Sequence, residues 1–470
     1  MAITRGQELI VDVERFADRG KSLARVDGYV VFIPHAVPGD RARVAVTKRR
    51  KKFAEAKIVE LIEASDLRTE PVCPYFTTCG GCKWQNVDYE AQLQAKHESV
   101  ASALEHHGGF EGLDIKPVIG APDAYRYRNK MEFSFSANRW LTDWEIASGQ
   151  PLDKRFALGL HAPGRFDKVL DISTCHLIPE SDMTVVNSIR DFLKERGWKA
   201  WSVRDRTGFL RHLVLRVGHN TGQRMVNLVT SERAPSRMDE FVAHVTKSHP
   251  EITSILNTVN SGPAQVAIGE HNETLFGPGF ITERLGKFEF QIGPNTFFQT
   301  NTQQAETLYE TALDFAELTP DEHVYDLYCG CGAISLFAAE RSARVTGVEL
   351  VPEAVEAAKS NADLNGVSNC QFVVGDMLKT FTDAFVVEHG RPDVVIVDPP
   401  RAGLHPKVAR RLSRLKAGRI VYVSCNPLSQ ANDLRELHAY YDIDRIQPVD
   451  LFPQTHHVEN VVLLKLREGV

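Results

Sequence analysis

Apolar and polar positions follow two different periods along the chain, and the change between them divides it. In residues 1–64, runs such as ELIVDVERF and DRARVAVTKRR alternate apolar and polar residues and are separated by DRGKS, VDG and AVPGD. This pattern predicts four or five short strands joined by turns. So many short strands in so short a segment favour a small β-barrel.

The rest of the chain predicts two further domains. Residues 65–292 combine a helical stretch at about 83–113 with β-rich runs such as RNKMEFSFS and HLVLRVGHN, which is typical of an α+β domain. From residue 293 to 470, apolar strands such as HVYDLY, DVVIVDPP and RIVYVSC alternate with helical segments. That alternation predicts an α/β domain built on an open, mostly parallel sheet, where ligands bind beyond the carboxyl ends of the strands.

Composition places this three-domain chain in an ordinary class. Apolar residues make up 43% of it and charged residues 25%, as in soluble globular proteins. No apolar run reaches the roughly 18 residues of a membrane span, and the start, MAITRGQELI, lacks the apolar stretch of a signal peptide. Eight cysteines without such a signal indicate a reducing compartment. We expect a cytoplasmic protein with no membrane partner, and a monomer.

Charge is uneven along the chain. The net charge of −6 argues weakly against a nucleic-acid partner, yet residues 41–57 hold eight Lys or Arg against the single acid Glu55. A local basic patch is the footprint of phosphate binding, and a barrel of the oligonucleotide-binding type would present it to a nucleic-acid backbone. The alternative is an ordinary solvated charge run.

Acidic residues recur at the carboxyl ends of the predicted parallel strands. Asp326, in VYDLYCGCG, precedes the turn glycines Gly330 and Gly332. The ends of the next three strands are marked by Glu349, Asp376 and Asp398. A dinucleotide site is the obvious competitor, but Ser335 stands where that fingerprint requires its third glycine. S-adenosylmethionine carries a sulfonium cation and no phosphate, so this acidic edge suits it better; helix caps are the alternative for each acid taken singly.

The fourth strand end continues into Asp398-Pro399-Pro400-Arg401. Two prolines make a stiff turn that lacks two backbone donors. Arg401 takes the place of the aromatic residue that follows a similar turn in some amino-group methyltransferases. A guanidinium there favours a phosphate or carboxylate partner.

The strand GRIVYVSCNP ends at Cys425, on the same edge as these acids, and QTHHVENVVLL places Glu459 before another apolar strand. A thiolate can add to C6 of a pyrimidine and make C5 nucleophilic, and a base must then remove the C5 proton. Cys425 would be the nucleophile and Glu459 the base. The alternative for Cys425 alone is a core thiol. His456 and His457 are assigned to the scaffold or to phosphate contacts.

A cysteine-rich stretch, CPYFTTCGGCKWQ, supplies Cys73, Cys79 and Cys82. A four-thiolate site needs one more ligand, and Cys175, in the same α+β region, is the best candidate. Spacing alone permits zinc or an iron–sulfur cluster. The role would be that of a structural clamp or an RNA-contact element. Trp84 could stack on a base or belong to the core.

Five motifs together resemble the uracil-5 RNA methyltransferases: FFQTN (297–301), DLYCGCG (326–332), DPPRAG (398–403), SCNP (424–427) and HHVENVVLL (456–464). The resemblance implies a Rossmann-like methyltransferase domain in which Cys425 attacks uracil and Glu459 is the base. It further implies that S-adenosylmethionine contacts Gln299, Tyr328, Glu349 and Asp398. Residues 1–64 look like a TRAM domain, an RNA-binding barrel. Ala333 departs from the ribosomal-RNA branch, which often carries Asn there.

The ribosomal branch of that family further implies that Cys73, Cys79, Cys82 and Cys175 hold a [4Fe-4S] cluster, with zinc as the alternative. The expected function is methylation of C5 of one uridine in 23S ribosomal RNA. Because a paired uridine is out of reach, the enzyme should act on a loop and extrude the base. A transfer-RNA T-loop uridine is the second candidate, and an RNA-binding scaffold with a degenerate site is the third.

Overall fold

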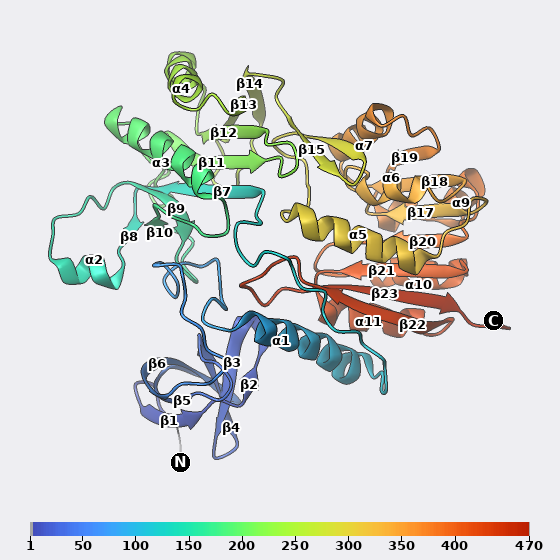
Figure 1. Ribbon diagram of the computed structural model, residues 1–470, viewed down its shortest axis with the longest axis horizontal. Helices are drawn as coiled ribbons and strands as arrows, with labels where there is room; N and C mark the ends of the chain where they lie inside the picture. Colours follow the sequence, from blue (N-terminus) through green and yellow to red (C-terminus); the bar gives the residue numbers. More distant parts are fainter. Residues whose placement is uncertain (1–2, 470) are drawn as a thin grey trace.

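The protein, described by a computed structural model over residues 3–469, consists of three blocks that follow one another in sequence (Figure 1). The first is a six-stranded sheet with strand order β1-β5-β6-β4-β3-β2. Its strands are β1 (Glu8–Asp12), β2 (Arg15–Phe16), β3 (Lys21–Val26), β4 (Tyr29–Pro34), β5 (Arg41–Arg49) and β6 (Phe53–Glu63), with a 3₁₀ turn η1 (Asp18–Gly20). Along β5, Ala42, Val44 and Val46 point inward while their neighbours stay accessible. Because β1 also lies against β3, the sheet curls toward a barrel.

The second block is an eight-stranded sheet, order β14-β13-β12-β11-β7-β9-β10-β8, mostly antiparallel. Its strands are β7 (Lys130–Ser136), β8 (Arg139–Trp140), β9 (Ala157–His161), β10 (Val169–Asp171), β11 (Leu210–Val217), β12 (Arg224–Thr230), β13 (Ile252–Val259) and β14 (His271–Phe276). Its helices are α2 (Asp143–Ser148), α3 (Glu180–Glu195) and α4 (Pro235–Ser248). The apolar faces of α3 and α4 join the sheet in one core that includes Phe133, Ile189, Leu213 and Phe241.

The third block is a seven-stranded sheet, order β19-β18-β17-β20-β21-β23-β22. Strands β17 to β21 are parallel, whereas β23 runs antiparallel to both β21 and β22. The strands are β17 (His323–Leu327), β18 (Arg344–Glu349), β19 (Cys370–Val374), β20 (Val394–Val397), β21 (Arg419–Ser424), β22 (Tyr441–Val449) and β23 (Glu459–Leu466). The helices are α5 (Thr302–Ala316), α6 (Ala333–Ala339), α7 (Pro352–Leu364), α8 (Met377–Thr380), α9 (Asp383–His389), α10 (Pro406–Leu415) and α11 (Pro427–Leu437).

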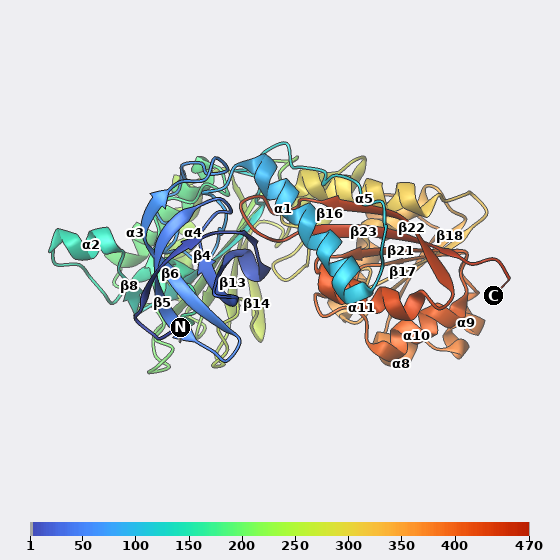
Figure 2. The same cartoon turned by 90° about the horizontal axis from the view of Figure 1, so that it is seen from below.

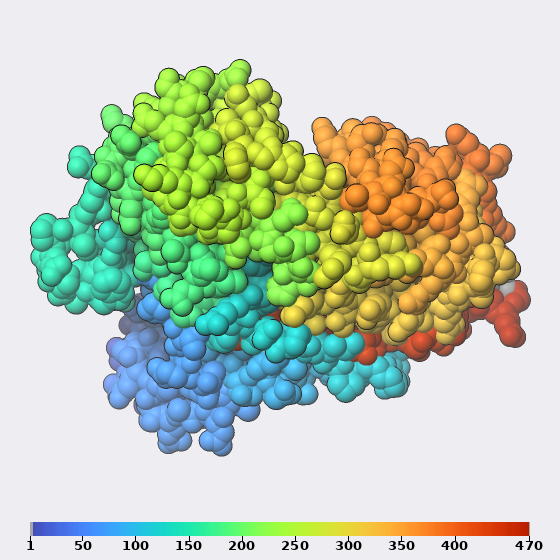
Figure 3. Space-filling model, turned by 45° about the horizontal axis from the view of Figure 1, so that its top comes forward, coloured from blue at the N-terminus to red at the C-terminus, as the bar shows by residue number. Residues whose placement is uncertain are grey.

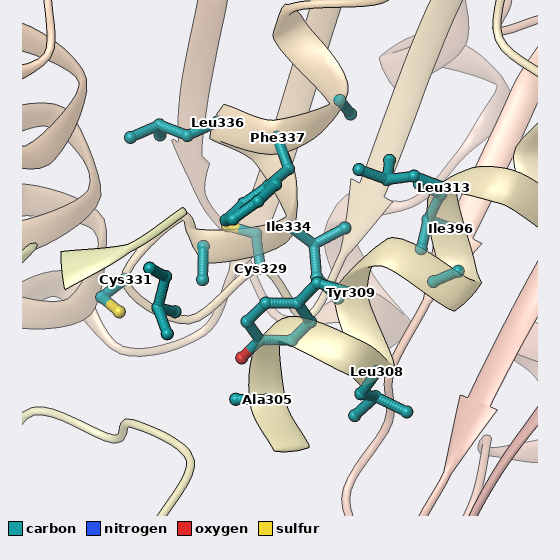
Figure 4. Close-up of a cluster of buried hydrophobic side chains, with 14 of the residues drawn as sticks. Ala305, Leu308, Tyr309, Leu313, Cys329, Cys331, Ile334, Leu336, Phe337 and Ile396 are labelled. Carbon is teal, nitrogen blue, oxygen red and sulfur yellow. The ribbon is translucent and has the colours of Figure 1, made fainter. Parts of the chain in front are cut away.

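Helices cover both faces of this sheet, which is why its central strands are apolar throughout. On one face α5 directs Leu308, Tyr309 and Leu313 toward Ile334 and Phe337 of α6 (Figure 4). A hairpin of β15 (Ile281–Leu285) and β16 (Phe288–Ile292) joins the same core. The hairpin thus packs with the third block, although it precedes the boundary at residue 293 expected from the sequence. On the other face, α10 and α11 pack over a second core.

Helix α1 (Tyr89–Ser102), continued by the π-helical turn η2 (Ala103–Gly108), leaves the second block and lies along the third. It runs beside α11 and β22 (Figures 1 and 2), and Val100 and Leu104 join the core of that face. The space-filling view shows a notch between the green second block and the orange α7 region (Figure 3). The longest helix within residues 3–469, α3, has 16 residues, and none there is long and apolar enough to cross a membrane.

Candidate active site and cysteine cavity

The carboxyl edge of the parallel sheet gathers the predicted site residues in one row. In the order of the strands, the row is Asp376, Glu349, Tyr328, Asp398, Cys425 and Glu459. Glu459 belongs to this edge because β23 runs antiparallel and therefore begins where β21 ends. Adjacent strands lie about 4.8 Å apart, so Asp398, Cys425 and Glu459, on successive strands, are close neighbours.

The turn between β17 and α6 is shaped by three residues in the left-handed region. Tyr328, Gly330 and Gly332 have φ values of 67°, 55° and 85°. A side chain at Gly332 would approach Ala358 and the Phe372 ring at 3.1 Å, so glycine is needed there for close packing as well as for its backbone angle. The result is a tight, largely buried turn at the sheet edge, in which Tyr328 and Gly330 keep some accessible surface.

Two acids support this turn. Glu349 Oε2 accepts a hydrogen bond from the Gly330 N–H at 3.2 Å, and its Oε1 accepts one from Val351 at 2.9 Å. Asp326 is buried in β17, where Oδ2 accepts a hydrogen bond from Ser335 Oγ at 2.5 Å while Oδ1 has no partner among residues 3–469. Ser335, which breaks the dinucleotide fingerprint, therefore anchors Asp326.

The segment FFQTN reaches the same turn from the start of α5. The Cys331 thiol lies 3.6 Å from the Phe297 carbonyl oxygen. Gln299 is 8% exposed, and its carbonyl accepts a hydrogen bond from Asn129 at 2.9 Å. Asp376, at the far end of the row, caps α8 by accepting a hydrogen bond from Leu378 N–H at 2.9 Å. Gln299 thus lies with the turn, whereas Asp376 already has a helix-capping role.

Cys425 and Glu459 face each other across two strands. The register pairs Ser424 with Asn460, and one step further places Cys425 opposite Glu459. Cys425 is half-buried and Glu459 is 4% exposed. Cys425 lies in the bend just after β21, and Glu459 is the first residue of β23. The Glu459 carboxylate is close enough to the thiol to raise its pKa. A thiol and a carboxylate therefore stand side by side at the carboxyl edge.

Burial governs the protonation of this pair. Burial, together with the Glu459 and Asp398 carboxylates, raises the pKa of the Cys425 thiol to about 11, while Arg401 lowers it. Burial and Asp398 raise the pKa of Glu459 to about 8. Asp398 keeps some accessible surface, yet burial and Asp326 raise its pKa to about 7. Crowded carboxyl groups of this kind favour a cation beside them, because a positive charge stabilises their ionised forms.

The Asp398-Pro399-Pro400-Arg401 turn is hydrogen-bonded to the residues after Cys425. The Arg401 carbonyl accepts hydrogen bonds from Asn426 Nδ2 at 3.0 Å and Ser429 Oγ at 3.2 Å. Asn426 also caps α11 through Leu428 N–H. These two contacts of Asn426 were not predicted from the sequence, although the motif SCNP contains the residue. Arg401 therefore both positions the Cys425 loop and presents its guanidinium at the site.

His456 and His457 lie beside Arg401, with their ring centroids 4.2 Å apart. An Arg401 amino group lies 3.3 Å from His457 Nδ1. Burial and Arg401 lower the pKa of His456 to about 4, and burial and His456 lower that of His457 to about 3. Both imidazoles are neutral at physiological pH, so the positive charge here belongs to Arg401.

Away from this edge, the four predicted metal ligands surround one cavity of about 30 Å³. It is lined by the thiols of Cys73, Cys79, Cys82 and Cys175. All four cysteines are free, and burial raises the pKa of each thiol, to about 12 for Cys82.

The other thiols lie elsewhere: Cys329 and Cys331 belong to the core shown in Figure 4, and Cys370 packs beside it. The structure thus brings together four cysteines from two distant segments. Within residues 3–469 no group of three or more His, Cys, Asp or Glu side chains has the arrangement of a metal site. The structure therefore shows neither a zinc site nor a cluster site.

Trp84, considered above as a platform for a base, belongs to the core. It is 4% exposed, and its ring lies 5.0 Å from that of Phe16 in β2, measured between centroids. The tryptophan therefore fastens the cysteine segment to the barrel instead of offering a stacking surface.

Comparisons with known proteins agree with this geometry. The sequence model of the tRNA (uracil-5-)-methyltransferase family matches residues 274–467, and that of the TRAM domain matches residues 3–59. An uncharacterized RNA methyltransferase of Chlorobaculum tepidum is 46% identical, covering 99% of this chain and 97% of its own. One from Bacteroides thetaiotaomicron is 41% identical, covering 96% and 100%.

A solved structure extends the likeness to the fold. The Pyrococcus abyssi tRNA (uracil-54, C5)-methyltransferase in complex with S-adenosyl-L-homocysteine is 30% identical, with a TM-score of 0.75, covering 97% of this chain and 100% of its own. The expected fold class, a Rossmann-like methyltransferase sheet with an N-terminal TRAM barrel, is therefore confirmed. The chain belongs to the tRNA (uracil-5-)-methyltransferase family and is an RNA (uracil-5-)-methyltransferase that uses S-adenosylmethionine.

Proposed function

We propose that the enzyme methylates C5 of a loop uridine in 23S ribosomal RNA through a covalent adduct between Cys425 and C6. The observation that carries the mechanism is the position of Cys425 and Glu459, each one residue beyond the Ser424–Asn460 pair and both beside Asp398. S-adenosylmethionine supplies the electrophilic methyl group, and Gln299, Tyr328, Glu349, Asp376 and Asp398 are the residues proposed to contact it.

Each step has a residue of this chain. Cys425 loses its proton to solvent, which at a pKa of about 11 leaves a small reactive thiolate fraction. The thiolate adds to C6, and the electrons of the C5–C6 double bond move toward O4, so that C5 becomes nucleophilic. After C5 has taken the methyl group, the Glu459 carboxylate removes the C5 proton. The C–H electron pair re-forms the double bond and expels the Cys425 thiolate. The proton leaves on Glu459, and the thiol is ready for another cycle.

The pKa of the base predicts the pH dependence of product release. Because burial raises the pKa of Glu459 to about 8, the ionised base is a minor form at pH 7 and becomes the major form above pH 8. The release step should speed up about tenfold per pH unit below pH 8 and level off above it. Single-turnover release of methylated RNA between pH 6 and 9.5 measures this. A rate that is flat across pH 6 to 9 would contradict the assignment.

The barrel is the proposed holder of the RNA backbone. Arg41 and Arg43 in β5 pair with carboxylates of neighbouring strands. Residues 48–52, which end β5 and form the turn into β6, are different: these five consecutive cations are all exposed, and none forms an ion pair with an acidic residue within residues 3–469. Uncompensated cations at a protruding tip are well placed to contact phosphates.

Charge reversal of that tip should weaken RNA binding without changing chemistry. In the variant Arg49→Glu/Lys51→Glu, affinity for RNA should fall and the slope of log affinity against log salt should become shallower by about 2. The turnover number at saturating RNA should stay near that of the wild type. The matched control Arg41→Glu changes a cation that is already paired. Equal losses of affinity in both variants would contradict this assignment.

The cysteine cavity is the proposed site of a [4Fe-4S] cluster. The supporting observation is that the four cysteines line one space, since four thiolates are the ligand set of such a cluster. Bound there, such a cluster would join the segment of Cys73–Cys82 to Cys175. Spacing and burial support a structural role.

Loss of one ligand should release the cluster. Cys175→Ser protein purified without oxygen should contain at least fourfold less iron and acid-labile sulfide than wild type, and its visible absorption should be bleached. Cys370→Ser, at a thiol outside the cavity, should keep both. Wild-type protein reconstituted with iron and sulfide that still lacks both would contradict the proposal.

The choice of RNA is tested by mapping modifications. Digests of 23S ribosomal RNA and transfer RNA from a strain that lacks the gene should show one 5-methyluridine missing from the ribosomal RNA. The likeness to an enzyme named for transfer RNA favours a T-loop uridine as the second candidate, and loss of that nucleotide instead would select it. Loss of neither would favour the RNA-binding scaffold.

A further inference from the structure

The loop that delivers the proposed base is held mainly by parts of the molecule outside its own strands. Residues 450–458 connect β22 to β23, and Glu459 is the first residue of β23. In Figures 1 and 2 this red loop extends from the sheet and reaches the beginning of α1. Its backbone therefore depends on contacts distant in sequence.

Five successive carbonyls of this loop each accept a hydrogen bond from another segment. At the start of α5, Gln304 Nε2 donates to the Asp450 carbonyl at 2.8 Å, and Asn301 Nδ2 donates to the Leu451 carbonyl at 3.2 Å. The Phe452 carbonyl accepts from Lys96 Nζ at 3.1 Å, and the Pro453 carbonyl accepts from Tyr127 Oη at 3.1 Å. The Gln454 carbonyl accepts from the backbone N–H groups of Lys83 and Trp84 at 2.9 and 3.1 Å. Such a set fixes the path of the loop, since loss of the donor to Leu451 or Pro453 would leave that buried carbonyl without a hydrogen bond.

Helix α1 adds a buried ion pair. Lys96 and Asp450 side chains are both 0% exposed, with Nζ 2.5 Å from Oδ1. The second oxygen of Asp450 accepts a hydrogen bond from Tyr89 Oη at 3.0 Å, also from α1. A buried pair of this kind holds its partners in one arrangement, because breaking it would leave a charge without compensation.

Gln92 of α1 makes two hydrogen bonds with Gln454, and this pair of hydrogen bonds is called the clasp. Its Oε1 accepts a hydrogen bond from the Gln454 N–H at 2.9 Å, and its Nε2 donates to Gln454 Oε1 at 3.1 Å. The same Nε2 donates to the carbonyls of Trp84 and Val87. Gln454 has a left-handed φ of 67°, which is unfavourable for a non-glycine residue and persists only where its surroundings impose it.

We propose that Gln92 and Lys96 of α1, together with the backbone of Lys83 and Trp84, are positioning residues for Glu459. They fix residues 450–454 and thereby aim the carboxylate at the C5 proton. Because Lys83 directly follows Cys82, any change that disorders the cysteine cavity is passed to the proton-removal step. This inference rests on the proposed covalent mechanism, in which Glu459 acts after methyl transfer.

The nucleophile is held by contacts that do not involve residues 450–454; Arg401 reaches the 450–458 loop at His457, beyond them. The loop after Cys425 is fixed by the Arg401 carbonyl and by the Asn426 cap of α11, neither of which uses residues 450–454. Loosening the clasp should therefore slow the release of Cys425 from the RNA far more than its attack. That difference separates a positioning role from a general loss of stability.

The test compares two variants of α1. Gln92→Met removes the clasp, while Val100→Ala weakens the packing of the same helix without touching the loop. Each is incubated with S-adenosylmethionine and total RNA from a strain that lacks the gene, and covalent protein–RNA adduct is measured on denaturing gels. Gln92→Met should accumulate about tenfold more adduct than wild type and lower the turnover number by a similar factor. Val100→Ala should form no more adduct than wild type.

Equal adduct levels in Gln92→Met and Val100→Ala would overturn the inference. If Gln92→Met does not fold, Gln454→Gly serves instead, since it removes the side-chain acceptor of Gln92 Nε2 and tolerates the left-handed backbone. 5-Fluorouridine RNA keeps the two claims apart. Wild type that forms no adduct with it refutes the covalent mechanism itself, whereas adduct in wild type without accumulation in the clasp variant refutes only the positioning role.

Discussion

Replacing Cys425 with alanine is expected to abolish methyl transfer while leaving S-adenosylmethionine binding intact. Without a thiolate at C6, C5 of uracil is too weak a nucleophile to take the methyl group. Removal of a covalent nucleophile lowers turnover in another enzyme by about 10⁶-fold, and we expect a loss of that order. Transfer of labelled methyl groups to RNA measures the first effect, and calorimetric titration with S-adenosylmethionine measures the second.

A cysteine outside the site provides the control. Cys370→Ala changes a half-buried thiol of the edge strand β19, four strands away from β21, and should retain turnover. Measurable turnover by Cys425→Ala, or loss of its S-adenosylmethionine binding, would show that the thiol is not a dedicated nucleophile.

Glu459→Gln is expected to trap the enzyme on its RNA. The amide keeps the size of the side chain but cannot accept the C5 proton, so the methylated adduct forms and is not resolved. General bases contribute about 10²- to 10⁴-fold to a rate, and the release step should slow by that factor. Adduct should build up to about one RNA per enzyme, measured by gel shift under denaturing conditions.

Asp376→Asn is the matched control for charge, because Asp376 ends β19 at the far side of the row and caps α8. It should weaken S-adenosylmethionine binding at most and accumulate no adduct. Normal turnover by Glu459→Gln would assign proton removal to another group, with Asp398 next in line by position.

Much of the active edge was predictable because its determinants are local. Each apolar strand of the last domain ends in a short polar segment, and parallel strands bring such ends to one edge. This logic places Glu349, Asp398 and Cys425 together without any knowledge of tertiary contacts. Glu459 follows from the same argument, since a last strand that runs antiparallel begins at the edge where the others end.

The loop clasp could not be predicted, because it depends on polar residues that are buried. Helix α1 covers Gln92 and Lys96 completely, whereas a polar residue in a helical pattern is read as exposed. Their partners, Asp450 and Gln454, lie more than three hundred residues further along. Periodicity carries no information about contacts of that range, so α1 was expected with the central domain rather than along the methyltransferase sheet.

The cysteines lie between these two cases. Three of them are close in sequence and one is distant, and the cavity collects all four. Spacing predicts that a group is bound but not which one, because zinc and iron–sulfur clusters accept the same ligands. The burial of Trp84 against Phe16 was also beyond reach, because only the fold reveals which side of the segment faces the barrel.

The central claim is that the Cys425 sulfur bonds to C6 of the target uracil. Its most direct measurement is mass mapping of the adduct formed with 5-fluorouridine RNA and S-adenosylmethionine, because fluorine cannot leave as the C5 proton does. The expected product is one methylated fluorouridine bonded to the tryptic peptide that contains Cys425. An adduct on any other residue, or none in an enzyme that methylates ordinary RNA, would contradict it.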